Sequence, residues 1–305
     1  MIFIDNLINK IKEKRSHCIV GIDTKIEYVP DFIKNKYEQD LEGNMAAILE
    51  FNKGIIDTVA PFVSCIKPQI AFYEAYGIEG FKVFKETVEY GKSKDLIIIA
   101  DIKRGDIGST AEAYANAYFG GGYVNVDAVT LNPYLGIDSI APFIKYMDER
   151  EKGVFILART SNKSAIDIQD IISNKKTIYE IVGEHIDRWG NECVGKYGYS
   201  SMGAVVGATY PKEMEKLRKI MSKSYFLVPG YGAQGGTGED VVGAFNKDGL
   251  GAVVNSSRGI ITAHKKEKYK GIYKDEECYK AILEETIQMR DNINRTLKKH
   301  GKLLW

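Results

Sequence analysis

Eight short apolar runs recur along the chain and constrain its fold more than any other feature. Most of them are continuous apolar stretches, rich in β-branched residues, rather than strict alternations of apolar and polar residues. Continuous runs of this kind indicate parallel strands that are covered by helices on their outer face. The predicted strands lie at residues 17–23, 62–70, 96–103, 126–133, 153–160, 203–209, 224–230 and 251–259.

Segments with helical periodicity separate these runs. Apolar residues recur at three- and four-residue spacing in 44–59, 77–93 and 275–300, and Pro211 stands at a favourable first position of another helix. A β–α unit repeated eight times predicts an α/β fold, a single (β/α)8 TIM barrel with eight parallel strands that spans residues 1–305. The longer stretches near 24–45 and 162–202 are expected to be insertions. A doubly wound open sheet is the main alternative.

The charge balance argues against some classes of partner. Among 305 residues, 42 Lys and Arg nearly balance 41 Asp and Glu, so the net charge of +1 gives no reason to expect nucleic acid or an acidic membrane as partner. The cysteines, Cys18, Cys65, Cys193 and Cys278, have no CxxC spacing, and the N-terminal segment lacks the continuous apolar region of a signal peptide. We therefore expect buried free thiols and a cytoplasmic protein.

The stretch ADIKRGDIGSTA places four charged side chains directly after an apolar run. Residues two apart in a strand face the same side, so Asp101 and Lys103 are expected to point together into the barrel mouth. Asp106 follows in the turn, and Thr110 stands near the start of the next helix. Carboxylates on both sides favour the ammonium form of Lys103, which suits a proton donor rather than a Schiff-base nucleophile. Taken alone, the pattern is more typical of a solvated surface turn.

The segment PGYGAQGGTGED, at 229–240, joins a strand end to a glycine-rich turn and a helix start. Glycines let backbone N–H groups approach an anion, and a helix N-terminus adds a favourable field. The pattern contains G-x-G-x-x-G, but a dinucleotide fingerprint normally opens the first β–α unit, whereas this one follows the seventh strand. Phosphate sites of such barrels commonly use the loops after strands seven and eight, where Arg258 suits a bidentate contact. A phosphate site is therefore favoured over a flexible surface loop.

Other polar residues stand at the predicted carboxyl ends of the strands, where the chemistry of a barrel belongs. Helix capping can explain some of them singly, but a lysine is almost never buried unless it is paired. The charged cluster at strands two and three would face the anion site at strands seven and eight, which predicts a phosphorylated small molecule as the ligand. These further candidates are Asp23, Lys67, Thr160, Ser161 and Gln234.

Ordered motifs along nearly the whole chain resemble those of the orotidine 5'-phosphate decarboxylases, most of all the longer bacterial subfamily. The resemblance implies a (β/α)8 barrel, usually a homodimer, that converts orotidine 5'-monophosphate (OMP) to UMP and carbon dioxide in pyrimidine biosynthesis, without metal or organic cofactor. The segments 24–45 and 162–202 match less distinctly. The matching motifs are GIDTK, CIKPQIAFYE, ADIKRGDIGSTA, TLNPYLG, LARTSN, VGATYP, VPGYGAQGG and NSSRGI.

The resemblance implies catalytic roles for residues at the matching positions. Lys67, Asp101, Lys103 and Asp106 would form a charged network, with Lys103 as the proton donor to C6 of the pyrimidine. Asp106 and Thr110 would reach into the neighbouring subunit, so that the two active sites of a homodimer are shared.

The same resemblance implies binding roles for other residues. Asp23 would hold ribose hydroxyls, and Ser161 or the adjacent Thr160 would contact the pyrimidine. Arg104 receives no role, and we expect a solvated or interface position for it. The residues expected at the phosphate are Gln234 and Arg258, assisted by the amides of Gly232 or Gly235.

Three alternative functions stay open at this point. A magnesium-dependent sugar-phosphate decarboxylase or aldol lyase of the same superfamily shares the D-x-K-x-x-D strand, although KPQ, QGG and the longer RGDIGSTA context disfavour it. An NADP-dependent oxidoreductase would place Arg258 at a 2'-phosphate but leaves Lys67 and the acid–base cluster without a task. A non-catalytic sensor would bind a phosphorylated ligand without turnover.

Overall fold

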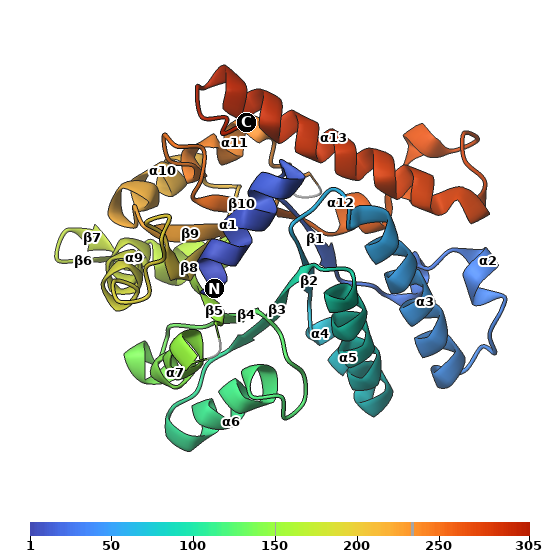
Figure 1. Cartoon of the computed structure of the whole chain (residues 1–305), viewed down its shortest axis with the longest axis horizontal. Coiled ribbons are helices and arrows are strands. Elements are labelled where there is room, and N and C mark those ends of the chain that lie inside the picture. The colour runs from blue at the N-terminus through green and yellow to red at the C-terminus, as the bar shows by residue number, and fades with distance from the viewer. Residues whose placement is uncertain (150, 233–234) are drawn as a thin grey trace.

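Eight parallel strands close into a barrel in the computed structural model, which describes residues 1–149, 151–232 and 235–305 (Figure 1). The closed sheet confirms the predicted α/β TIM barrel and excludes the doubly wound open sheet. The barrel strands are β1 (Cys18–Ile22), β2 (Cys65–Pro68), β3 (Ile97–Arg104), β4 (Ala128–Leu131), β5 (Gly153–Arg159), β8 (Ser200–Val206), β9 (Ser224–Val228) and β10 (Ala252–Ser256). Their order around the barrel is β1-β10-β9-β8-β5-β4-β3-β2.

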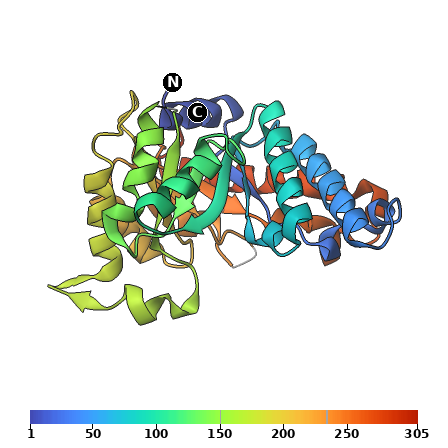
Figure 2. The same cartoon turned by 90° about the horizontal axis from the view of Figure 1, so that it is seen from below.

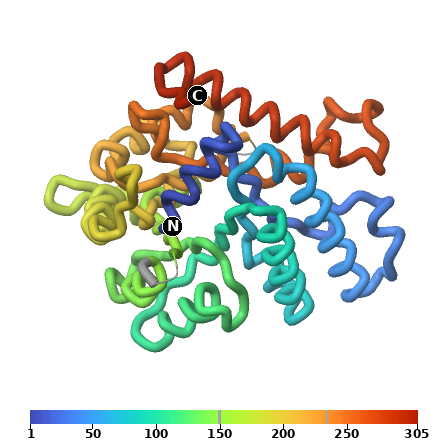
Figure 3. Tube along the Cα trace, in the orientation of Figure 1, coloured from blue at the N-terminus to red at the C-terminus, as the bar shows by residue number. Residues whose placement is uncertain are grey.

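Helices surround this sheet, as the periodicity predicted. The helix expected at 77–93 forms over those same residues, and Pro211 is the first residue of its helix. The longer helices are α1 (Phe3–Lys14), α3 (Leu41–Val59), α5 (Gly77–Ser93), α6 (Gly108–Phe119), α7 (Ala141–Glu149), α9 (Ile178–Trp189), α10 (Pro211–Ile220) and α13 (Cys278–Lys299). Shorter ones are α2 (Asp31–Lys34), α4 (Ala71–Glu74), α8 (Ile166–Gln169), α11 (Gly238–Val241) and α12 (Arg258–Ile261). In Figure 3, α13 runs along one side of the barrel, where it contacts α3.

The strand predicted at 203–209 begins earlier, at Ser200. Ser200 and Ser201 are buried although they are polar, because the Ser200 hydroxyl donates to the Gly190 carbonyl at 2.8 Å and accepts from the Met202 amide at 3.0 Å. A buried hydroxyl with two such partners does not need solvent. Within the segment 162–202, α9 is a regular barrel helix, and the part that projects holds α8 and a small hairpin, β6 (Ile172–Ser173) and β7 (Lys176–Thr177).

Two layers of buried side chains make up the core. Ala100 and Ile102 of β3 lie in the layer between the sheet and the helices, whereas Ile97 and Ile99 lie in a second layer with residues of α1. The alternation along β3 therefore places Asp101 on the inner face, as predicted. All four cysteines are buried, and none forms a disulfide within the described residues, as expected.

Helix α1 closes the barrel at the amino ends of the strands. Its apolar face packs Phe3, Leu7 and Ile11 into the inner core layer, beside Ile19 and Val253. Figure 2 shows α1 and both chain ends on one side of the molecule and the β6–β7 hairpin on the opposite side. The open mouth of the barrel is therefore the end that carries the hairpin. Within the described ranges, no helix has the length and apolar character needed to cross a membrane.

Candidate active site

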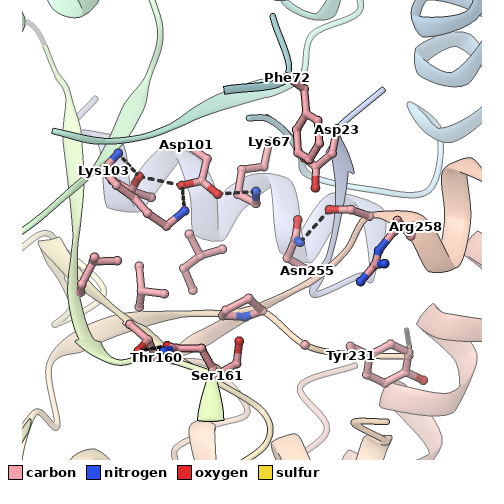
Figure 4. A pocket seen from close by; sticks show the side chains of 18 of the residues that line it. Asp23, Lys67, Phe72, Asp101, Lys103, Thr160, Ser161, Tyr231, Asn255 and Arg258 are labelled. Atoms are coloured by element: carbon pink, nitrogen blue, oxygen red, sulfur yellow. Dashed lines mark hydrogen bonds and ion pairs between the residues drawn. The ribbon is translucent and has the colours of Figure 1, made fainter. Parts of the chain in front are cut away.

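Three charged side chains form a row of ion pairs at the carboxyl ends of β2 and β3 (Figure 4). Lys67 Nζ donates to Asp101 Oδ2 at 2.7 Å, and Lys103 Nζ donates to Asp101 Oδ1 at 2.5 Å. Lys67 and Asp101 are buried, whereas 44% of the Lys103 side chain is exposed. One carboxylate thus lies between two ammonium groups, and the Lys103 side chain is the more exposed of the two lysines.

Burial and charge have opposite effects on the pKa values of this row. Burial disfavours the ammonium form of Lys67, but the carboxylates of Asp101 and Asp23 outweigh it and raise the pKa of Lys67. Burial likewise disfavours the carboxylate of Asp101, but Lys67 and Lys103 outweigh it and hold the pKa of Asp101 well below its ordinary range. Lys67 and Asp101 therefore keep their charges throughout the neutral pH range.

Thr130 of β4 fixes this row, and sequence analysis missed it. Its Oγ1 donates to Asp101 Oδ1 at 2.9 Å and accepts from the amides of Ile102 and Lys103, each at 3.0 Å. Lys103 has a φ of +47°, a left-handed conformation that is costly for a residue with a Cβ. Period-two alternation would have revealed Thr130, because Ala128 lies in the inner core layer and Thr130 shares its face.

A cavity of about 550 Å³ opens beside the row, within the size range of small-molecule sites. It brings together seven residues predicted from the sequence, namely Asp23, Lys67, Asp101, Lys103, Thr160, Ser161 and Arg258. The predicted strand 251–259 included Arg258, but β10 ends two residues earlier, at Ser256, and Arg258 is the first residue of α12. Pro229, Gly230 and Tyr231, at the start of the predicted phosphate segment 229–240, also line it. Other lining residues, which sequence analysis did not single out, are Lys25, Tyr28, Phe72, Thr130, Leu157, Asn162, Val205, Leu227, Asn255 and Ser257.

The structure separates the roles available to Thr160 and Ser161. Thr160 Oγ1 accepts from Gln169 Nε2 at 2.7 Å and donates to Asn162 Oδ1 at 2.6 Å, so this hydroxyl is already engaged. Figure 4 shows the Ser161 side chain directed into the cavity. Within the part of the chain that the structure describes, the Ser161 hydroxyl forms no hydrogen bond. Both residues line the cavity, and of the two hydroxyls that of Ser161 is the one without a partner among the described residues.

Two buried acceptor atoms at the end of β1 and β10 lack partners among the described residues. They are Asp23 Oδ1 and Asn255 Oδ1, and both residues line the cavity. Gly21 of β1 makes room beside them, because a Cβ at this position would lie 1.8 Å from Ser257 Oγ and 3.3 Å from Asn255 Oδ1. A ligand with hydroxyl donors would satisfy acceptors of this kind.

Other predicted site residues lie away from this cavity. Asp106 Oδ1 accepts from the Ile107 amide at 2.8 Å, and Thr110 is an exposed residue of α6. The amides of Gly232 and Gly235 donate within their own loop, to Gly236 O and Gly232 O, each at 2.8 Å. Gln234 lies outside the described residues.

Arg104 is half-buried and paired rather than solvated. Its guanidinium forms an ion pair with Glu74 of α4 and lies over the Tyr114 ring, 5.5 Å from the centroid. The residue therefore ties the end of β3 to helices α4 and α6, which explains the fourth charge of the ADIKRGDIGSTA stretch within one chain.

Comparison with known proteins identifies the family. The model of the "Orotidine 5'-phosphate decarboxylase / HUMPS family" matches residues 19–272. The orotidine 5'-phosphate decarboxylase of Clostridium tetani is 47% identical over 294 residues, 95% of this chain and 97% of its own, and that of Petrotoga mobilis is 50% identical over 267 residues, 87% and 90% of the two chains. The solved OMP decarboxylase of Leishmania donovani superposes with a TM-score of 0.73 at 29% identity and covers 95% of this chain and 99% of its own. By this extent of similarity, the chain belongs to the orotidine 5'-phosphate decarboxylase / HUMPS family.

Proposed function

We propose that this protein is an orotidine 5'-phosphate decarboxylase that converts OMP to UMP and carbon dioxide in pyrimidine biosynthesis. The observation that carries the proposal is the Lys67–Asp101–Lys103 row, whose exposed ammonium lines a cavity that also contains Arg258. The relatives that are 47% and 50% identical over most of their length carry this name.

The proposed chemistry places the negative charge of the reaction beside Lys103. Cleavage of the bond between C6 and the carboxyl carbon releases carbon dioxide and leaves the bonding electron pair on C6. A fixed ammonium group beside this atom stabilises the developing charge and then transfers a proton to C6. Asp101 orients Lys103 through their 2.5 Å contact, and the ammonium is restored by a proton from water.

Binding groups distributed along the cavity would hold the rest of the nucleotide. Arg258, with Gln234, would bind the phosphate, and Asp23 Oδ1, which has no partner among the described residues, would accept from a ribose hydroxyl. Ser161 would contact the pyrimidine. Phosphate binding remote from C6 supplies energy that can offset strain at the reacting atom.

The donor set of the cavity bears on the magnesium-dependent alternative. Both oxygens of Asp101 accept from ammonium groups, and the described residues contain no group of three or more His, Cys, Asp or Glu side chains that could hold a metal ion. Magnesium prefers carboxylate and other oxygen ligands in octahedral geometry. This cavity therefore supports the lysine-centred reaction better than a metal-centred one.

Purified protein mixed with OMP tests the proposal when pyrimidine absorbance is followed in the ultraviolet. We expect loss of OMP with formation of UMP, at the same rate with and without EDTA. Failure of a folded sample to consume OMP would refute the proposal, and UMP binding without turnover would identify a sensor. Inhibition by EDTA would favour the magnesium-dependent enzyme, and binding of NADP would favour the oxidoreductase.

We further infer a homodimer with shared active sites. Asp106 and Thr110 lie outside their own chain's cavity, and the neighbouring surface exposes apolar side chains, with Ile107 52%, Tyr134 83% and Leu135 46% exposed. A second copy of the chain would bury this surface and bring Asp106 to the partner's cavity. Four buried cysteines that form no disulfide within the described residues fit a cytoplasmic location, which we also propose.

Mixed dimers test the sharing of sites. Lys103→Ala and Asp106→Ala homodimers are each expected to be inactive. Co-expression should restore roughly a quarter of wild-type activity, because about half of randomly paired dimers are mixed and each has one intact site. Mixed dimers without activity, isolated with two affinity tags, would contradict shared sites.

A further inference from the structure

The segment 162–177 leaves the barrel after β5 and turns back onto the rim of the cavity. Its outer surface exposes isoleucines, among them Ile168, whereas Gln169 at the end of α8 faces the barrel. Gln169 Oε1 accepts from the Thr160 amide at 3.0 Å, and Gln169 Nε2 donates to Thr160 Oγ1 at 2.7 Å. One side chain of the segment thus holds both the backbone and the hydroxyl of Thr160.

A buried arginine secures the same contact. Arg159, the last residue of β5, is 1% exposed, and its guanidinium lies 2.9 Å from Asp170 Oδ1 and 3.3 Å from Gln169 Oε1. It also lies over the Tyr210 ring, 4.0 Å from the centroid. A buried cation is costly without such partners, so Arg159 strongly favours the state in which the segment is docked.

The chemistry of the contact requires an amide at position 169. The Thr160 amide and the Arg159 guanidinium are both donors, so the atom that faces them must be a carbonyl oxygen. Thr160 Oγ1 already gives its proton to Asn162 Oδ1, so its remaining bond must be accepted from a donor. Only a side chain with one acceptor and one donor at its end satisfies both demands, and glutamine has the length to reach them.

We propose that Gln169 is a positioning residue for the decarboxylation, which holds Thr160 so that the adjacent Ser161 is presented to the pyrimidine ring. Thr160, Ser161 and Asn162 line the cavity, whereas Gln169 is not among the described residues that do, so its effect passes through Thr160. Two weaker contacts hold the other side of this turn, from Thr209 Oγ1 to Ser161 O and from Tyr210 to Asn162 O, both at 3.4 Å. The inference rests on the proposed function, because it assigns the segment after β5 a task in that reaction.

Steady-state kinetics with OMP test the proposal through a graded series at one position. Gln169→Ala should lower kcat/KM roughly tenfold, about the effect of one or two neutral hydrogen bonds. Gln169→Glu should fall between that variant and the wild type, because it keeps the acceptor oxygen but loses the donor to Thr160. Ile168→Ala is the matched control, since it lies in the same short helix with 57% of the residue exposed, and it should leave kcat/KM unchanged.

A double-mutant cycle separates positioning from general loss of structure. If Gln169 acts through Ser161, then Gln169→Ala should cost much less on a Ser161→Ala background than in the wild type. Equal fold-losses in both backgrounds would overturn the proposal, and so would wild-type kcat/KM in Gln169→Ala.

Hydrogen exchange of the ligand-free protein measures the contact without any reaction. The amides of 158–166 should exchange faster in Gln169→Ala than in the wild type, whereas those of the barrel strands should not change. Unchanged exchange in 158–166 would overturn the proposal. Failure of the wild type to consume OMP would instead refute the proposed function. The exchange difference between Gln169→Ala and the wild type would persist in that case, because it does not depend on the reaction.

Discussion

Several local contacts hold Lys103 in an unfavourable backbone conformation. Its left-handed backbone, with φ of +47°, coincides with a shift of register between β3 and β4, and its amide is held by Thr130. Strain of this kind costs roughly 1–3 kcal/mol and persists where surrounding contacts fix it. As a result, the Lys103 ammonium group forms an ion pair with Asp101 and still lines the cavity.

Replacing Lys103 with alanine should therefore remove both charge stabilisation and the proton donor. We expect kcat to fall by at least about 10³-fold, since loss of one transition-state electrostatic contact alone costs about 10²–10³-fold. UMP should still bind, because Arg258 and Asp23 lie elsewhere in the cavity. Absorbance kinetics and calorimetric titration with UMP measure the two effects, and near-normal turnover would contradict the role of Lys103.

The charged row of Lys67, Asp101 and Lys103 was predictable from the sequence, whereas the residues that hold it and the neighbouring turn in place were not all predicted. Period-two alternation places Asp101 and Lys103 on one face, and the structure pairs them. Asn132, a polar residue at the end of the next strand, instead caps its own turn by accepting from the Tyr134 amide at 3.1 Å. Gln169 is beyond such reasoning, because nothing in its local sequence shows that it folds back onto Thr160.

Helix α1 closes the end of the barrel opposite the mouth and so supports the inner core beneath the cavity. Its side chains fill the space between the strands from below, where Leu7 is fully buried with Ile8 and Ile11. The N-terminal segment has an amphipathic pattern in the sequence, but periodicity alone does not say which surface an apolar face covers. That placement depends on closure of the barrel, which is a property of all eight strands.

Leu7→Ala measures what α1 contributes. Removing a fully buried leucine side chain should lower the free energy of unfolding by roughly 2–5 kcal/mol, because apolar contacts are lost and a cavity remains. Urea denaturation followed by circular dichroism checks this value. Asn6→Ala, at an exposed position of the same helix, should stay within about 0.5 kcal/mol of the wild type. Equal stability of the two variants would show that α1 does not complete the core.

At the scale of the whole molecule, the closed end of the barrel joins the two ends of the chain. His17 precedes β1, stacks on the Trp305 ring with centroids 5.1 Å apart, and contacts the Phe245 ring edge-on at 4.8 Å. The side chains that contact the His17 ring are thus aromatic, whereas the open end holds the charged row. Burial lowers the pKa of His17 to about 3.

This buried histidine should make the protein sensitive to acid. The unfolded chain protonates His17 below about pH 6.5, whereas the folded protein does so only near pH 3, so stability is lost as the pH falls between these values. From pH 7 to pH 5 the loss of unfolding free energy due to His17 should be about 2 kcal/mol.

His17→Leu tests this contribution, because it removes the titrating group and keeps an apolar side chain of similar size. Urea denaturation at pH 7 and pH 5 should show a smaller loss of unfolding free energy in this variant than in the wild type. The loss that remains in the variant includes the contribution of His264, because burial lowers the pKa of His264 to about 4. Identical losses in the two proteins would mean that His17 is protonated in the folded state at pH 5 despite its burial.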